Sequence, residues 1–507
     1  MGVLRYTASL DTTITNAFKS NLVGRGTGSN MGESDIIEIF SIYAQASTGS
    51  AEYSRGLIKF GTGKIASDRT AGTIPAKDSV SFYLQLYNAE HSQTLPKKYT
   101  LVAAAVTRAW DEGFGLDMES YTDADSANWI NAQSGASGPT AWTRIGGDYS
   151  KTLEYQQYFE NGHEDFSVNI TPLVENWLDG TTANHGLGIF LTASQEAYYS
   201  SSTGQDTSNI IHNPTGSRRS YYTKKLFARN TEFFFKRPVI EARWSSAEKD
   251  DQGTFFLSSA LAPKRDNLNC LYLYNTIRGR YQDIPGLDHN KILLTLYPSL
   301  SPTALPIGLP ASDNVATNDD INITGSRVST GIYKACFAYT SSTTTIYPVW
   351  RSGSSEGSWG SYNQLFTGSA ITVKNFKSQG YNPNPEYVNK VVNLRDSYTT
   401  KETARFRLFS RLRDWSPTIY TKATTEIISE IINSASFKIF RIIDNLEAVP
   451  YGTGSDLHTQ VSYDVSGNYF NLDMSLLEPG YQYGIKLIYY INDSWVEQPE
   501  TFKFRVD

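Results

Sequence analysis

Acidic side chains gather directly after a strand-like segment that ends at Trp110: Asp111, Glu112, Asp117, Glu119, Asp123 and Asp125. Carboxylate oxygens in an irregular loop are the ligands that Ca²⁺ takes, in sets of about 6–8. The spacing differs from that of an EF-hand loop, which leaves two interpretations open. One is a calcium site built on Asp111, Glu112 and Asp117, and the other is an acidic loop that is simply hydrated.

Other patterns give little support to catalysis. The acidic stretch could hold the two carboxylates of a glycosidase, but sequence spacing does not say how far apart they lie. Gly353–Gly357 matches the G-x-S-x-G pattern of hydrolases without the helix that this pattern requires. Gly24–Gly28 resembles a phosphate-binding loop but lacks the Lys and Ser or Thr that follow one. The histidines stand singly and never at metal-ligand spacing. We therefore expect no enzyme and no cofactor, with calcium as the one exception.

The composition argues against several classes of partner. The net charge is −6, whereas a protein that grips phosphate is usually basic, so we expect no direct contact with nucleic acid. No apolar run has the length of a membrane span or of a signal peptide. We therefore expect no membrane contact and synthesis in the cytoplasm.

Two cysteines, Cys270 and Cys336, are too few for a disulfide scaffold or for a zinc site made of cysteines. Both fall in the middle of the chain, so a bridge between them is geometrically conceivable. We expect buried free thiols.

The sequence predicts an all-β protein of several domains in series. It contains 33 Tyr, 24 Phe and 9 Trp against 4 Met, and aromatic and β-branched residues favour strands. Short apolar runs separated by Gly, Ser, Asn and Asp turns recur along the chain. A chain of 507 residues is also too long for one ordinary core. We place β-sandwich domains at 1–250 (jelly-roll-like), 251–382 (middle β domain) and 383–507 (immunoglobulin-like), with a Pro-rich linker at 381–387.

One helix is predicted inside the first domain. The stretch 171–180 has Thr171 as a helix cap, a proline at the first helical position and Gly180 as a stop. Large side chains with apolar neighbours at matching period predict the core of this domain: Trp110, Trp177, Phe190 and Trp244. The polar, Gly-rich stretch 1–31 shows little strand pattern, so we expect an arm that becomes ordered only against a partner.

Several stretches of the first 195 residues resemble the disaggregatase-related (DNRLRE-type) β-sandwich, a jelly roll like those of carbohydrate-binding modules. The matching pieces are the strand SRGLIKF (54–60), the strand VSFYLQLY (80–87), AWDEG (109–113), Trp142 with GGDY (146–149), and VNITPLVENWLDG (168–180) leading into HGLGIFLT (185–192). The chain departs from this family at Asn169, where an Asp is usual, and in the long insertion around 117–138. The resemblance implies a jelly-roll fold for this part of the chain.

The remaining sequence is similar to virion structural proteins of marine, cyanophage-like tailed phages. The stretches that carry this similarity are 220–244, 257–275, 440–455 and 472–486. The resemblance implies a non-enzymatic component of a virion, at the neck, collar, tail or fibre attachment, assembled in the host cytoplasm. Its partners would be other virion proteins and further copies of itself in a symmetric ring. The alternatives are a carbohydrate-binding protein for host adsorption or capsid decoration, and, with less support, a glycan depolymerase.

Overall fold

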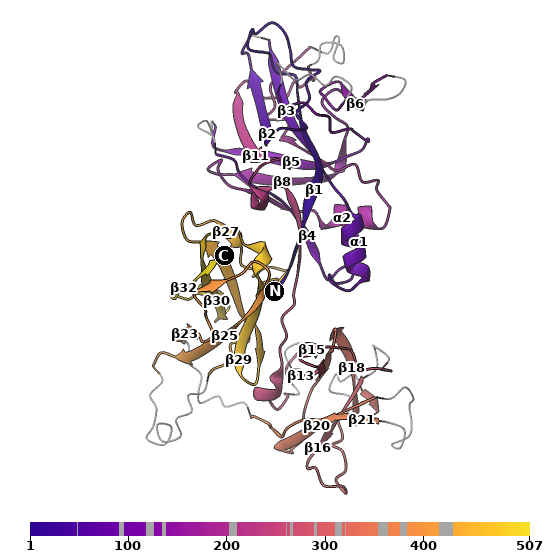
Figure 1. The fold of residues 1–507 in the computed structure, drawn as a ribbon, viewed down its shortest axis with the longest axis vertical. Helices are drawn as coiled ribbons and strands as arrows, with labels where there is room; N and C mark the ends of the chain where they lie inside the picture. Colours follow the sequence, from indigo (N-terminus) through magenta and orange to yellow (C-terminus); the bar gives the residue numbers. More distant parts are fainter. Residues whose placement is uncertain are drawn as a thin grey trace. The chain divides into compact units, whose positions relative to one another are not determined.

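The computed structural model describes the chain except for residues 48, 91–95, 118–125, 134–137, 202–209, 260, 264–266, 288–291, 310–316, 320, 353–362, 376–381, 383 and 415–428. The chain divides into two compact units, a first unit of Gly2–Trp244 and a second unit of Ser245–Asp507 that also takes in Met1. Strands dominate both units, which confirms the predicted all-β class of serial β-sandwich domains (Figure 1).

The first unit folds around one long strand, β1 (Gly2–Thr15), that takes part in two layers. Its first half pairs antiparallel with β12, and after an irregularity between Ala8 and Leu10 its second half pairs with β3. The resulting sheet has the order β8-β5-β10-β3-β1-β12-β4-β9, with β2 and β11 paired beside β3. Its other strands are β2 (Ile36–Tyr43), β3 (Ala51–Phe60), β4 (Ser81–Leu86), β5 (Tyr99–Val106), β8 (Tyr149–Phe159), β9 (Phe166–Asn169), β10 (Leu187–Leu191), β11 (Tyr221–Phe227) and β12 (Val239–Trp244). Strands β6 (Asn131–Gln133) and β7 (Thr140–Ala141) pair with each other in a separate two-stranded sheet.

This topology shows that the predicted N-terminal arm is wrong. Residues 2–15 form a strand with neighbours on both sides, and Ile14 is fully buried. Asn30, later in the same stretch, is also fully buried, and its side-chain amide donates hydrogen bonds to the carbonyl oxygens of Glu112 and Ala127. This strand was not recognised in the sequence because its residues alternate only weakly between apolar and polar. A strand that is stabilised by pairing with distant segments does not need a strong local pattern.

Two short helices cover one end of the main core. Helix α2 (Thr171–Leu178) agrees with the predicted helix, but Ile170 is its cap residue. The Thr171 hydroxyl, predicted to cap the helix, instead accepts a hydrogen bond from the backbone N–H of Phe82 at 2.8 Å. Helix α1 (Gly63–Thr70) was not predicted. It lies beside α2, and Arg69 and Glu175 join the two helices in an ion pair of 2.6 Å (Figure 1).

The predicted core aromatic residues take different positions. Trp177 packs in the main core of the first unit and Trp110 in a second, smaller core under the loops, and both are buried. Trp244 is partly buried against the main core. Phe190 is also partly buried, but its ring contacts Tyr149 at a centroid distance of 4.7 Å. It therefore lies on the opposite face of its strand from the main core.

The second unit contains two hydrophobic cores. The middle part forms an eight-stranded sheet in the order β13-β19-β18-β16-β20-β21, with β17 and β22 at its sides. Its elements are the 3₁₀ turn η2 (Asp251–Gly253) and the strands β13 (Asn269–Tyr274), β14 (Thr276–Ile277), β15 (Arg280–Tyr281), β16 (Ile292–Tyr297), β17 (Thr317–Asp319), β18 (Asn322–Ser329), β19 (Ile332–Phe337), β20 (Thr345–Ser352), β21 (Asn363–Thr367) and β22 (Ile371–Thr372).

The C-terminal part is a sandwich of a four-stranded sheet, β23-β25-β29-β28, and a six-stranded sheet, β24-β32-β30-β26-β27 with β31. Phe406, Phe437, Phe470 and Phe504 meet between the sheets in its core. Its strands are β23 (Tyr387–Val391), β24 (Ser397–Tyr398), β25 (Thr403–Leu412), β26 (Ala435–Arg441), β27 (Glu447–Val449), β28 (Ser462–Asp464), β29 (Gly467–Asp473), β30 (Gln482–Ile491), β31 (Ser494–Glu497) and β32 (Phe502–Val506), with a 3₁₀ turn η6 (Met474–Leu476).

The two cysteines form a disulfide, so the expectation of free thiols is wrong. Strands β13 and β19 pair antiparallel with Cys270 directly opposite Cys336, which places their Cα atoms 4.0 Å apart. The residues lie 66 positions apart in the sequence, and only the strand register brings them together. Composition alone could not reveal this register.

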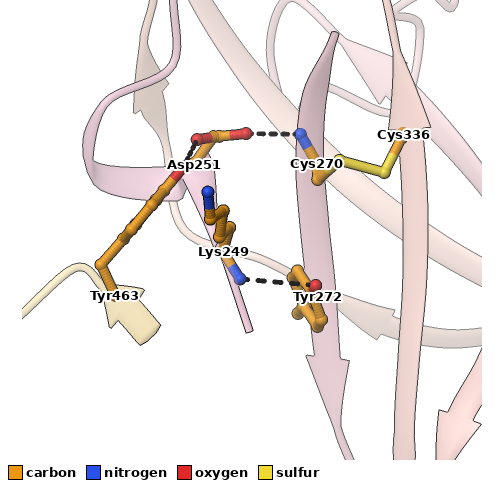
Figure 2. Close-up of a disulfide and its surroundings, with 6 residues drawn as sticks. All are labelled: Lys249, Asp251, Cys270, Tyr272, Cys336 and Tyr463. Atoms are coloured by element: carbon orange, nitrogen blue, oxygen red, sulfur yellow. Dashed lines mark hydrogen bonds between the residues drawn. A yellow bond between two sulfur atoms is a disulfide. The ribbon is translucent and has the colours of Figure 1, made fainter. Parts of the chain in front are cut away.

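The carboxylates of Asp250 and Asp251 accept backbone N–H groups at the edge of β13, and Asp251 also contacts the C-terminal part. The Asp251 carboxylate accepts the backbone N–H of Cys270 at 2.7 Å and the Tyr463 hydroxyl at 2.7 Å (Figure 2). The backbone N–H of Tyr272 faces the neighbouring Asp250 carboxylate. The side chains thus satisfy backbone groups that an edge strand leaves without a partner strand.

Candidate binding cleft on the first unit

A cleft of about 640 Å³ is lined by residues of β3, β8 and β10 and of the loops next to them. Along β10, Leu187 and Ile189 point into the main core, whereas Phe190 lines the cleft. Gly188 also belongs to the face that lines the cleft, because a Cβ atom there would lie 2.0 Å from the Tyr149 ring. Successive side chains of β10 thus point to opposite faces of the sheet, one face packed in the main core and the other lining the cleft.

One wall of the cleft is the loop between Trp142 and β8. The Asp148 carboxylate accepts the backbone N–H groups of Thr143 at 2.9 Å and Arg144 at 3.0 Å. Gly146 has a φ of 79°, and a Cβ atom there would lie 2.7 Å from the Trp129 ring. The loop is therefore held by its own hydrogen bonds and by close packing, which fixes the backbone that carries Arg144.

The floor of the cleft contains a buried ion pair. The Arg55 guanidinium donates to both carboxylate oxygens of Glu196 at 2.7 and 2.8 Å, and each side chain is 8% exposed. The guanidinium also lies over the rings of Trp129, Tyr149 and Phe190, at 5.6, 5.6 and 5.0 Å from their centroids. Burial raises the pKa of Glu196, while the neighbouring Arg55 acts to lower it. Both oxygens are occupied by Arg55, so Glu196 is a structural group rather than a proton donor.

The rim carries charged side chains of a different kind. Arg144, Lys151 and Glu154 are exposed and line the cleft. Within the described residues, none of these three side chains has an ion-pair or hydrogen-bond partner. His212 also lines the cleft, and its ring nitrogen Nδ1 is 3.1 Å from the carbonyl oxygen of Ser201. The rim therefore offers free polar groups above an aromatic floor, which is typical of a ligand-binding cleft.

The predicted calcium residues lie elsewhere in the first unit. Glu112 forms a bidentate ion pair with Arg229, with both N···O distances at 2.9 Å, and accepts the backbone N–H of Asp11 at 2.8 Å. Asp111 accepts a long hydrogen bond from Gln133, and Asp117 is exposed. Among the described residues, no group of three metal-ligating side chains comes together. Glu119, Asp123 and Asp125 fall outside these residues, and the calcium site stays a prediction.

Neither of the two glycine-rich motifs forms a described catalytic or phosphate-binding element. Gly24–Gly28 leads towards strand β2 and opens no helix. Gly353–Gly357 lies outside the described residues. Among the described helices, none is long and apolar enough to cross a membrane.

Sequence reasoning missed the floor of the cleft. Arg55 and Glu196 are 141 residues apart, and no local motif connects them. A signal existed for the wall, because GGDY at 146–149 was one of the stretches that resembled a known sandwich family. Its two glycines and Asp148 are the residues that shape the loop.

Comparisons with known proteins do not assign the chain to a family. No family model matches the chain, and no curated protein matches it significantly. One similar solved structure is titled "Marsupial T cell receptor"; it is 8% identical with a TM-score of 0.15, and the match covers 50% of this chain and 71% of that chain. Another, "Crystal structure of chicken CNTN1 FN1-FN3 domains", is 10% identical with a TM-score of 0.15, over 56% of this chain and 82% of that chain. TM-scores this low carry no argument about function, which must come from the residues themselves.

Proposed function

We propose that this chain is a non-enzymatic structural component of a tailed-phage virion, at the neck, collar, tail or fibre attachment. The observation that carries the proposal is an exposed aromatic turn between β11 and β12, which includes the 3₁₀ turn η1 (Phe234–Lys236). Phe233 and Phe234 are 45% and 61% exposed. Exposed aromatic side chains on a loop that rigid strands position are typical of protein–protein contacts.

Basic side chains brace this turn. Lys236 lies 5.0 Å from the centroid of the Phe227 ring, and Arg237 lies 5.4 Å from that of Phe234. The Arg237 guanidinium also donates to the carbonyl oxygen of Thr231 at 3.1 and 3.2 Å. The turn is therefore shaped before any partner arrives, which reduces the entropy lost on binding. A partner virion protein, or a further copy of the chain in a symmetric ring, is the occupant that we propose.

Buried charges in the first unit also fit a framework better than an active site. Glu241 lies between Arg5 and Arg243, with N···O distances of 2.7 Å to each. Arg69 pairs with Glu175, and Arg55 with Glu196. These groups are matched to one another inside the protein. Such pairs hold strands and helices in place by compensating each other's charge.

Location is the direct test. Negative-stain imaging of purified particles with a labelled antibody against this chain should show signal at the neck, collar or tail. Particles that carry no signal, while the free protein reacts with the antibody, contradict the proposal. Signal on the capsid surface favours the decoration alternative.

A double variant tests the aromatic turn. Phe233→Ala/Phe234→Ala should leave a folded protein, because both rings are exposed, but lower its incorporation into particles several-fold. The matched control is Phe114→Ala, which removes a ring that is 79% exposed elsewhere on the same unit. Equal incorporation of the double variant and the control would show that the turn is not the contact.

Carbohydrate binding is the second candidate, and the cleft favours it. The cleft combines an aromatic floor with free polar groups on the rim. Cleavage of a polysaccharide has less support, because Glu196 and Asp148 are both occupied by internal donors and only Glu154 among the lining carboxylates is free. Incubation with host polysaccharide and measurement of reducing ends separates the two, since a binding protein releases none.

A further inference from the structure

We propose that the cleft on the first unit binds an acidic oligosaccharide, one that carries carboxylate or sulfate groups. This inference rests on the second candidate function above, and it adds the charge of the ligand. The aromatic floor and the rim are described residues of a single unit, so the site depends on no contact between units.

Two carboxylates of the cleft are already neutralised by groups of the protein itself. Glu196 is matched by Arg55. Asp148 accepts two backbone N–H groups and lies 3.3 Å from the Arg108 guanidinium. Neither carboxylate is left to repel an anion, because each already has its own donors.

The remaining charged side chains of the cleft are mostly cationic. Arg144 and Lys151 have no acceptor among the described residues, and Glu154 is the one lining carboxylate without a donor there. Two cationic side chains without a partner therefore line the cleft together with one such anionic side chain. A cleft with low-dielectric walls concentrates such a potential, which draws in ligands of the opposite charge.

The floor of the cleft is formed in part by two aromatic rings. Tyr149 and Phe190 are both partly buried and meet at a centroid distance of 4.7 Å with an angle of 41°. The parts of these rings that Arg55 and Gly188 leave uncovered offer an apolar surface to the C–H face of a sugar ring, and Thr107 and Thr143 line the same cleft. A small inorganic anion would use the cations and leave this floor uncovered, so the geometry favours a saccharide.

The test compares acidic oligosaccharides with their neutralised forms. The probes are galacturonic-acid oligomers and their methyl esters, and sulfated heparin oligomers with their desulfated forms, titrated into the full chain by calorimetry. At least one acidic probe should bind about tenfold more tightly than its neutral form, which corresponds to one well-placed charge contact. Its affinity should fall as salt is added. The inference is overturned if no acidic probe binds, or if charged and neutral forms bind equally.

Variants place the binding in the cleft. Arg144→Ala/Lys151→Ala should weaken the acidic probe at least about tenfold, and Glu154→Gln should strengthen it by removing the free anion. The matched control is Lys77→Ala, which removes an exposed lysine that pairs with Asp179 outside the cleft. Its affinity should equal that of the wild type. A loss in the control that matches the double variant would reduce the effect to non-specific charge and overturn the site.

The outcome is separable from that of the proposed function. The double variant Arg144→Ala/Lys151→Ala should be incorporated into particles normally, because the cleft and the turn at Phe233 and Phe234 have no residue in common. A neutral oligosaccharide that binds as well as any acidic one would keep carbohydrate binding and overturn only the charge assignment. Absence of the chain from particles would contradict the virion proposal and leave the binding result intact.

Discussion

At the scale of single residues, the large buried side chains could be predicted and the buried charges could not. Trp177 stands out in the sequence because its helix has apolar neighbours at helical period and a proline at its start. Arg55 has no such signal, because its partner Glu196 comes from a segment 141 residues later. A local pattern records which residues are apolar, but pairs between distant segments depend on the topology of the whole sheet.

Replacement of Trp177 by Ala should lower the stability of the first unit by about 3–5 kcal/mol, the usual cost of a large-to-small change in a core. The side chain is 6% exposed and packs in the main core. Urea unfolding followed by far-UV circular dichroism measures the change. Phe114→Ala, which removes an exposed ring, should change stability by less than about 0.5 kcal/mol. A Trp177 variant that unfolds like the wild type would mean that α2 does not dock on this core.

Arg55→Met should cost about 3–5 kcal/mol, because it leaves the buried Glu196 carboxylate without its partner. The double variant Arg55→Met/Glu196→Leu removes both charges and should recover much of this loss. Thermal unfolding of the two variants beside the wild type gives the comparison. If the double variant is less stable than the single one, the pair contributes through something other than charge compensation.

At the scale of elements, the strands and their class follow from the sequence, whereas their register does not. The disulfide shows this clearly, because Cys270 and Cys336 meet only through the antiparallel pairing of β13 with β19. The strand β1 shows it again, because its partners β3 and β12 lie far apart in the sequence. Register is set by which faces are buried, and a single sequence gives that information only for strongly alternating strands.

The disulfide should contribute about 4 kcal/mol to the stability of the second unit, from the loop-closure entropy of its span. The span is 66 residues. Cys270→Ser/Cys336→Ser should therefore unfold at markedly lower urea concentration than the oxidised wild type. Reduction of the wild type with dithiothreitol should give the same shift. A double variant that matches the oxidised protein would show that the bond adds nothing to folding.

Asp250 should make the second unit less stable as the pH rises. Burial raises the pKa of its carboxyl from 3.8 to about 7, and the charges of Asp251 and Asp464 act in the same direction. The backbone N–H groups of Gln252 and Tyr272 oppose the shift. The folded state therefore holds a proton that the unfolded chain releases, and the stability from this group is lost between about pH 4 and about pH 7.

The variant Asp250→Asn keeps an acceptor oxygen and cannot ionise. Its melting temperature should exceed that of the wild type increasingly as the pH is raised from about 4 to about 7, and the difference should then stay level up to about pH 9. Differential scanning calorimetry over this range gives the two curves. A difference that does not change between about pH 4 and about pH 7 would show that Asp250 does not titrate in this window.

At the scale of the whole molecule, the predicted N-terminal arm and the observed strand give opposite outcomes for one experiment. Deletion of residues 1–31 removes β1 and the buried Asn30, which bonds to the loop after Trp110. The shortened protein should have an unfolded first unit, with loss of near-UV circular dichroism from its tryptophans. A truncated chain with native spectra would contradict the central place of β1. The division at Trp244 and Ser245 also makes a folded second unit the expected remainder.

The pairing of β1 with β12 sets a constraint on biosynthesis. Gly2 pairs with Trp244, so β1 leaves the ribosome well before β12, and the part of β1 that pairs with β12 lacks this partner until residue 244 has been made. Contacts of such long sequence separation form slowly. During that interval β1 presents an unpaired edge, which is open to wrong partners on the nascent chain or on neighbouring polysomes. Ribosome-bound chains that stop short of residue 244 should therefore depend on holding chaperones, whereas chains extended well past it should not.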